Sequence, residues 1–250
     1  MMKLSANLGF LFRGLALPDA IRAARRQGFG AVEMHWPYEA DPVAIAAVLA
    51  ETGMPLLGVN TARGDADAGD FGLSALPGRE AEARAAIDEA VAWARAAGCR
   101  NIHVMAGKAA GGEAFGTFVA NLRYAAGKAS PDGIGILIEP LNPRDAPGYF
   151  LADLPTALRA VEATDGAARV MFDCYHMQIV HGDLLRTVER HLSAIGHIQF
   201  AAVPDRAEPD HGEVDYRWLL RALADAGYAG FFGAEYRPLG GSFAWMEDHA

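Results

Sequence analysis

Short apolar runs rich in β-branched residues alternate with longer Ala- and Arg-rich stretches of helical period, and this alternation occurs eight times in 250 residues. A parallel sheet requires this order, because each strand must be followed by a crossover before the next parallel strand can begin. The chain is therefore expected to be an α/β protein with a parallel sheet. The predicted strands are Lys3–Leu8, Ala31–His35, Pro55–Asn60, Asn101–Ala106, Ile134–Pro140, Val170–His176, Ile195–Ala201 and Phe231–Tyr236.

The helical stretches carry start and stop signals at their ends. Several have Pro near the first turn, and Gly28, Gly53, Gly98 and Gly227 stand just past the ends of four of them. An eighth helix has to lie within Ser242–Ala250, so we expect it to be short or truncated. The other predicted helices are Pro18–Gln27, Pro42–Thr52, Arg79–Ala97, Phe115–Ala129, Leu154–Ala163, Asp183–Leu192 and Asp215–Ala226.

Eight βα units in a chain of this length favour one closed barrel over an open doubly wound sheet. No linker rich in Gly, Pro or Ser divides the sequence, so residues 1–250 are predicted to form a single domain. A dinucleotide-binding fold would also need a G-x-G-x-x-G fingerprint after its first strand. The segment after Leu8 reads Gly-Phe-Leu-Phe-Arg-Gly, which lacks this spacing. The predicted fold is a single (β/α)₈ TIM barrel.

The formal net charge of -9 at pH 7 disfavours some classes of partner. Nucleic acids and anionic membranes are bound mainly through Lys and Arg, so neither is expected. No stretch reaches the roughly 20 apolar residues that span a bilayer, and the cysteines, Cys99 and Cys174, have no metal-type spacing. Without a signal-peptide pattern, the expected location is the cytoplasm. A small anionic substrate and a homo-oligomer are both compatible with the sequence.

Four consecutive predicted strands, the fifth to the eighth, end in a polar side chain, and the carboxyl ends of the strands carry the active site of a TIM barrel. The four residues are Glu139, Asp173, Gln199 and Glu235. Because side chains alternate along a strand, the residues two positions earlier share their inward direction and the residues one position earlier point outward. The inward set is Leu137, Met171, His197 and Gly233, and the outward set, which is uniformly apolar, is Ile138, Phe172, Ile198 and Ala234.

A single acid at a strand end is more often a solvated loop residue than a ligand. Four polar residues in one phase are harder to explain in that way. Three carboxylates and an amide that converge away from water would repel each other unless a cation lay among them. The ligand atoms would all be oxygen, which suits Mn²⁺, Mg²⁺ or Co²⁺ better than a structural zinc ion. The sequence therefore predicts one divalent cation on Glu139, Asp173, Gln199 and Glu235.

Five longer motifs carry a resemblance to a known family. The chain resembles the hydroxypyruvate isomerases and the related 2-oxo-tetronate isomerases, which belong to the xylose-isomerase-like barrels. The resemblance covers essentially the whole chain. The motifs are Ile-Glu-Pro-Leu-Asn-Pro-Arg-Asp-Ala-Pro-Gly-Tyr-Phe-Leu (Ile138–Leu151), Asp-Cys-Tyr-His-Met-Gln-Ile (Asp173–Ile179), Gly-His-Ile-Gln (Gly196–Gln199), Glu-Pro-Asp-His-Gly-Glu-Val-Asp-Tyr (Glu208–Tyr216) and Ala-Glu-Tyr-Arg-Pro (Ala234–Pro238).

The resemblance implies the same four metal ligands and gives two of them, Glu139 and Glu235, a second role as the proton-transfer pair. It also implies that His176 and Arg206 contact the substrate, as the corresponding residues do in sugar epimerases of the superfamily. Asp145 matches a further substrate contact, although those relatives carry Glu there. The Arg206 guanidinium is the sequence candidate for the substrate carboxylate, since its fork can bind both oxygens. Among other polar residues, His35 at the end of the second strand is a candidate for the pocket lining.

The activity implied by the resemblance is the isomerisation of hydroxypyruvate to tartronate semialdehyde through an enediolate, with a carboxylate on each side of the metal as base and acid. A 2-oxo-tetronate isomerase is the nearest alternative. Sugar 3-epimerases of the superfamily are a more distant alternative. They typically carry His where Gln199 stands, which counts against that activity. A metal-dependent endonuclease would need additional His ligands and a basic face. A small-acid binding protein that keeps the metal without turnover is the non-enzymatic alternative.

Overall fold

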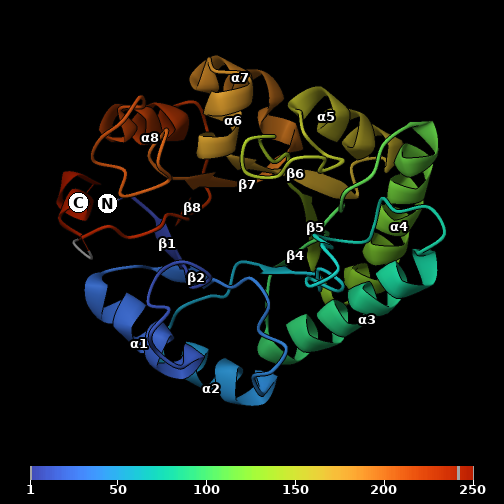
Figure 1. Ribbon diagram of the computed structural model, residues 1–250. Helices are drawn as coiled ribbons and strands as arrows, with labels where there is room; N and C mark the ends of the chain where they lie inside the picture. Colours follow the sequence, from blue (N-terminus) through green and yellow to red (C-terminus); the bar gives the residue numbers. More distant parts are fainter. Residues whose placement is uncertain (1, 241–242, 250) are drawn as a thin grey trace.

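Eight parallel strands lie at the centre of the computed structural model, and helices surround them (Figure 1). The structure describes residues 2–240 and 243–249. The order of the strands around the sheet is β2-β1-β8-β7-β6-β5-β4-β3. Their bounds are β1 Leu4–Asn7, β2 Ala31–Glu33, β3 Val59–Asn60, β4 Asn101–His103, β5 Gly135–Ile138, β6 Ala168–Asp173, β7 Ile195–Phe200 and β8 Phe232–Ala234.

Backbone hydrogen bonds between β2 and the segment that leads into β3 close the sheet. The Val32 N–H donates to the Pro55 carbonyl at 3.1 Å, and the Leu57 N–H donates to the Val32 carbonyl at 2.8 Å. Regular strand geometry in β3 covers only Val59–Asn60, although the apolar run from Pro55 predicted a longer strand. The predicted (β/α)₈ barrel is therefore confirmed, with its least regular seam between β2 and β3.

The helices agree with the sequence signals at most of their ends. Helices α2 and α5 match their predicted ranges residue for residue, and each begins at an Asp whose side chain accepts a backbone N–H, from Val43 in α2 and from Thr156 in α5. The bounds are α1 Leu17–Gln27, α2 Pro42–Thr52, α3 Glu80–Ala97, α4 Gly112–Ala129, α5 Leu154–Ala163, α6 Cys174–Val180, α7 Leu184–His191 and α8 Tyr216–Asp225, with short 3₁₀ helices η1 Ser130–Asp132, η2 Leu192–Ala194 and η3 Ala244–His249.

Helix α6 corrects the prediction that the sixth strand runs to His176. Strand β6 ends at Asp173, and α6 begins at the next residue. The Asp173 side chain caps this helix, because its Oδ1 accepts the Tyr175 N–H at 2.8 Å. A short apolar run cannot be assigned to strand or helix from periodicity alone, which explains the error. The consequence for the site is that His176 lies one helical turn after Asp173.

The C-terminal segment is short, as predicted. In place of an eighth α-helix within Ser242–Ala250 the structure has the 3₁₀ helix Ala244–His249, while both end residues of the predicted range lie outside the described part. Trp245 anchors this helix with only 3% of its surface exposed. Its ring packs against Phe200, and its indole N–H donates to the Tyr236 hydroxyl at 3.1 Å. One large side chain thus holds the segment against the barrel.

The predicted alternation along strands β5 to β8 is confirmed. The four outward residues belong to the apolar core between strands and helices and have no exposed surface. Three of the four inward residues instead line a small cavity inside the barrel, together with Gln199. The fourth is Gly233, where an added Cβ would lie 2.5 Å from Glu33 Oε1. The barrel interior is therefore partly polar below the ends of these strands.

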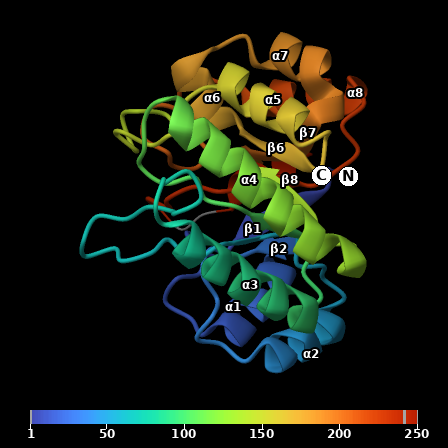
Figure 2. The ribbon, with the colours of Figure 1, turned by 90° about the vertical axis from the view of Figure 1, so that its right-hand side faces the viewer.

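The loops that follow the strands extend from one end of the barrel, and the loop between β3 and α3 reaches furthest from it (Figure 2). No described helix combines the length and the apolar character that crossing a membrane requires.

Candidate active site

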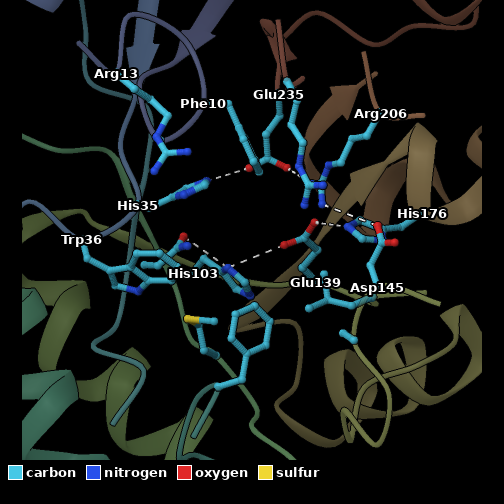
Figure 3. Close-up of a pocket in the computed structure, with 17 residues that line it drawn as sticks. Phe10, Arg13, His35, Trp36, His103, Glu139, Asp145, His176, Arg206 and Glu235 are labelled. Atoms are coloured by element: carbon cyan, nitrogen blue, oxygen red, sulfur yellow. Dashed lines mark hydrogen bonds and ion pairs between the residues drawn. The ribbon is translucent and has the colours of Figure 1, made fainter. Parts of the chain in front are cut away.

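A cavity of about 290 Å³ lies at the carboxyl ends of the strands, and we refer to it as the mouth pocket (Figure 3). Two predicted site residues, Asp173 and Gln199, are not part of its lining and are buried, with 0% and 2% of their surfaces exposed. The structure thus brings residues from β5, β6, β7 and β8 to one end of the barrel. The predicted residues that line the pocket are Glu139, Glu235, His176, Arg206 and Asp145.

Glu139 follows β5 directly and is buried. Its Oε2 lies 3.7 Å from Nδ1 of His103, whereas its Oε1 has no hydrogen-bond partner among the described residues. Burial raises the pKa of Glu139 well above its ordinary value, and the neighbouring charges of Glu235 and Asp173 raise it further. One carboxylate oxygen is therefore left available for a ligand.

Glu235 stands just beyond β8 and is surrounded by donors. The Asn7 amide donates to its Oε1 at 2.8 Å, and Nε2 of His35 lies 2.9 Å from the same oxygen. The Arg206 guanidinium donates to its Oε2 at 2.5 Å. Burial would raise the pKa of Glu235, but the charge of Arg206 and the hydrogen bond with His35 hold it at about 2.

The carboxyl groups of Glu139 and Glu235 face each other across the mouth pocket (Figure 3). Their environments shift the two pKa values in opposite directions, upward for Glu139 and downward for Glu235. Two carboxyl groups whose pKa values are shifted apart can serve as an acid and a base for one bound molecule. The arrangement is suited to moving a proton between neighbouring atoms of a small substrate.

Asp173 and Arg206 form a buried ion pair beneath the pocket. Arg206 Nη2 lies 3.3 Å from Asp173 Oδ2, so one guanidinium nitrogen serves both Asp173 and Glu235. Burial raises the pKa of Asp173 to about 7, although the charge of Arg206 opposes the shift. Arg206 has a φ of 58°, a backbone conformation that non-glycine residues rarely adopt. The chain thus accepts local strain to place this guanidinium between the two carboxylates.

The surroundings of His176 determine which ring nitrogen carries the proton. The backbone N–H of Asn142 donates to His176 Nδ1 at 3.0 Å, so Nδ1 acts as an acceptor. Burial lowers the pKa of His176 well below its ordinary value, which keeps the ring neutral and leaves the proton on Nε2. Nε2 lies 3.7 Å from Asp173 Oδ2 and 3.9 Å from Glu139 Oε1 and has no hydrogen-bond partner in the described chain. His176 therefore presents an N–H donor to the site.

Asp145 lies in the loop after β5, where its Oδ2 accepts the Tyr175 hydroxyl at 2.7 Å and lies 4.0 Å from Arg206 Nη1. Its own backbone N–H donates to the side chain of Asn142, which also contacts His176. Asp145 thus lines the pocket within a hydrogen-bonded loop, so it is placed where a substrate contact was predicted.

Gln199 is oriented by an acid that the sequence analysis missed. The Gln199 amide donates from Nε2 to Glu33 Oε2 at 2.7 Å, so its Oε1 points the other way and has no partner among the described residues. Glu33 is itself held by Ser5, whose hydroxyl donates at 2.5 Å, and by His197 Nε2 at 2.9 Å. Burial would raise the pKa of Glu33, but His197 keeps it below the ordinary value.

The missed residues Glu33 and Asn7 do have a sequence signal. Glu33 is an acid inside the apolar run of the second strand, and it shares the inward phase of His35, which lines the pocket as predicted. Asn7 is a polar residue near the end of the first run. Polar residues near the ends of β1 and β2 therefore extend the set of polar strand-end residues that the sequence pattern indicated on the fifth to eighth strands.

Oxygen and nitrogen ligand atoms gather beneath the mouth pocket. Glu139, Asp173 and His176 each offer a ligand atom within 4.8 Å of the others. His176 fits poorly in such a set, because a metal on Nε2 would have to displace the proton that the Asn142 N–H keeps there. The two unpartnered side-chain oxygens, Glu139 Oε1 and Gln199 Oε1, are better suited to a cation.

Comparisons with known proteins agree with this architecture. The family described as xylose isomerase-like TIM barrel matches residues 21–249. The chain is 42% identical to a 2-oxo-tetronate isomerase of Cupriavidus necator, over 100% of this chain and 99% of that protein. It is 35% identical to the hydroxypyruvate isomerase of Escherichia coli K12, over 95% and 94% of the two chains.

A crystal structure titled as an AP endonuclease of family 2 from Brucella melitensis has the same fold. It superposes with a TM-score of 0.94 at 39% sequence identity and covers 99% of this chain and 98% of that one. The family match, the full-length relatives and the paired carboxyl groups at the barrel mouth lead to one assignment. This chain is an isomerase of the xylose isomerase-like TIM-barrel family and belongs with its hydroxypyruvate and 2-oxo-tetronate isomerases.

Proposed function

We propose that this enzyme isomerises a small hydroxy-oxo acid, converting hydroxypyruvate to tartronate semialdehyde with the help of one divalent cation. The observation that carries the proposal is the pair of buried carboxyl groups, Glu139 and Glu235, that face each other across the mouth pocket. The names of the full-length relatives support the choice of substrate class. The four-carbon 2-oxo-tetronates are the alternative substrates.

The reaction needs a base on one carbon and an acid on its neighbour. One carboxylate removes a proton from the hydroxymethyl carbon of hydroxypyruvate, and the electron pair forms the carbon–carbon double bond of an enediolate. The other carboxyl group delivers a proton to the former keto carbon. The proton of the terminal hydroxyl passes to the former keto oxygen, so that the terminal carbon becomes the aldehyde and its neighbour carries the new hydroxyl group. Glu139 and Glu235 exchange these roles when the direction reverses.

His176 supports the same step from the side of the pocket. The Asn142 N–H donates to His176 Nδ1, so the ring proton is on Nε2. Among the described residues, Nε2 has no acceptor at hydrogen-bond distance. It can donate to a substrate oxygen as negative charge develops there, which stabilises the enediolate more than the ketone. Arg206 and Asp145 also line the pocket and are the proposed contacts of the remaining substrate oxygens.

The residues at the site fit a divalent cation. The buried oxygens of Glu139 and Gln199 lack partners, and three carboxylates lie together with Arg206 as their main positive neighbour. Glu139, Asp173, Gln199 and Glu235 would hold the ion through oxygen, the donor type that suits Mn²⁺, Mg²⁺ and also Co²⁺. When bound, the cation would act as a Lewis acid that polarises the substrate carbonyl.

The Glu33→Gln variant tests the orientation of Gln199. A neutral amide at position 33 cannot accept from Ser5, His197 and Gln199 together, so the Gln199 amide loses its anchor. We expect Mn²⁺ to bind roughly ten- to a hundredfold more weakly, as for other residues that orient a metal ligand. The measurement is a calorimetric titration of the metal-stripped variant with Mn²⁺, with thermal unfolding recorded alongside.

Glu208→Gln is the matched control for this experiment. Glu208 is also a buried carboxylate, but it accepts the backbone N–H groups of Leu239 and Gly240 instead of holding a site residue. Its variant is expected to bind Mn²⁺ as the wild type does. Equal affinities in wild type and Glu33→Gln would show that Glu33 does not position Gln199 for the metal.

A comparison of kcat/KM distinguishes the three-carbon substrate, hydroxypyruvate, from the four-carbon 2-oxo-tetronates. Both are measured with one Mn²⁺-loaded preparation. We expect hydroxypyruvate to be preferred by roughly ten- to two-hundredfold, the range that one extra carbon group is worth in a shaped pocket. A preference for the 2-oxo-tetronates would assign the alternative. Binding of both acids without turnover would instead indicate a metal-dependent binding protein.

A further inference from the structure

Two arginines at the opening of the mouth pocket have no charged partner among the described residues. Arg13 in the loop after β1 and Arg237 in the segment after β8 both line the pocket and are exposed. Within the part of the chain that the structure describes, neither guanidinium takes part in a hydrogen bond or an ion pair. The Arg13 side chain turns toward the pocket (Figure 3). These two groups are free to bind an anion.

Arg206, the third arginine of the pocket, is already engaged. Its Nη2 is shared by Asp173 and Glu235, and only 9% of its surface is exposed. A substrate carboxylate that used this nitrogen would have to displace one of two buried carboxylates. The sequence made Arg206 the candidate for binding the substrate carboxylate. Its position instead favours an electrostatic role, in which its charge stabilises Asp173 and Glu235.

The pocket has two ends of different charge. The buried end carries Glu139 and Glu235, whereas the exposed end carries Arg13 and Arg237. Phe10 lies at the exposed end, with its ring 5.8 Å from the Arg237 guanidinium carbon and 5.0 Å from that of Arg206. An acid that enters with its carboxylate toward the two arginines leaves its carbonyl and hydroxyl groups between the two glutamates.

We propose that Arg13 and Arg237 bind the substrate carboxylate and thereby select acids over neutral ketoses. The inference rests on the proposed isomerase function, but it holds for the three-carbon and the four-carbon acid alike, since both carry the carboxylate. Local cations are needed because the chain as a whole has a net charge of -9 and repels anions. Guanidinium groups suit the role because each can donate two hydrogen bonds to one carboxylate.

The kinetic test uses Arg13→Gln, Arg237→Gln and the double variant in the full, Mn²⁺-loaded enzyme. We expect the double variant to raise KM for hydroxypyruvate by roughly ten- to a hundredfold, the effect of losing charge-assisted hydrogen bonds, with a smaller change in kcat. KM for dihydroxyacetone, which keeps the reacting groups but has no carboxylate, is expected to stay the same. A parallel rise for both compounds would overturn the proposal.

A binding measurement separates this inference from the proposed function. Glycerate has the carboxylate but no carbonyl to isomerise, so calorimetric titration with glycerate reads the arginine site without turnover. We expect the double variant to lose roughly ten- to a hundredfold in glycerate affinity. If wild type binds glycerate in this arginine-dependent way but does not turn over hydroxypyruvate, the proposed activity fails and the carboxylate site stands.

Arg144→Gln is the matched control, because Arg144 is an exposed arginine in the loop after β5 that is not part of the pocket lining. It removes the same charge from the same end of the barrel. We expect glycerate affinity and KM close to wild type. An equal loss of glycerate affinity in Arg144→Gln would show that the overall charge of this end of the barrel, and not these two arginines, binds the anion. Unchanged glycerate affinity in the double variant would show that the carboxylate binds elsewhere. Either result would refute the proposed site.

Discussion

Replacing Glu139 or Glu235 by Gln is expected to lower kcat for hydroxypyruvate by roughly a hundred- to ten-thousandfold, the range that general acid–base catalysis contributes. Gln has the size of Glu but cannot take up or deliver a proton at its amide. Both residues face the same pocket from opposite sides, so loss of either interrupts the transfer between neighbouring carbons. We expect both variants to remain folded, because the apolar core lies between strands and helices, away from the pocket.

Two measurements separate chemistry from metal binding in these variants. Turnover is recorded at saturating Mn²⁺, since each substitution also removes a proposed ligand, and circular dichroism reports the fold. Exchange of the substrate carbon-bound hydrogen in D₂O reports proton removal directly and is expected to fall with kcat. The Glu208→Gln control should keep wild-type rates, because Glu208 binds backbone N–H groups outside the pocket. Near-normal turnover in both variants would contradict the paired-carboxylate mechanism.

Removal of divalent cations by a chelator is expected to abolish activity while the barrel stays folded, and Mn²⁺ or Mg²⁺ should restore it. The expectation follows from the three buried carboxyl groups, of which Glu139 and Asp173 have pKa values raised by burial and by the charge of Glu235. A bound cation would offset that repulsion and stabilise the native state by about 2.7 kcal/mol at a metal concentration a hundred times the Kd.

The chelation experiment combines three readouts on one preparation: turnover, metal content and the thermal midpoint. Activity should return with the metal, and the midpoint should rise as the metal concentration increases. A protein that contains no metal yet turns over hydroxypyruvate at the normal rate would disprove the metal dependence. Loss of the fold on chelation would show instead that the ion has a structural role.

The sequence was informative where the relevant interaction is local. The alternation of strand and helix signals predicted the barrel, and helices α2 and α5 match residue for residue because capping Asp residues, first-turn prolines and periodicity act within a few positions. The inward phase of Leu137 and Met171 follows from the alternation along a strand in the same way. Where local signals conflicted, as between strand and helix after Asp173, the prediction was wrong.

The sequence by itself thus determined the fold and the positions from which the polar ring of the site projects, since Glu139 and Glu235 stand at strand ends in inward phase. Only the tertiary structure decided which polar atoms are already paired. Glu33 on β2 and Gln199 on β7 are brought together across the barrel, and Asn7 meets Glu235 at the ends of the neighbouring strands β1 and β8. Strand phase depends on neighbours along the chain, whereas these pairings depend on the stagger of strands around the barrel and on side-chain rotamers, which no local pattern encodes.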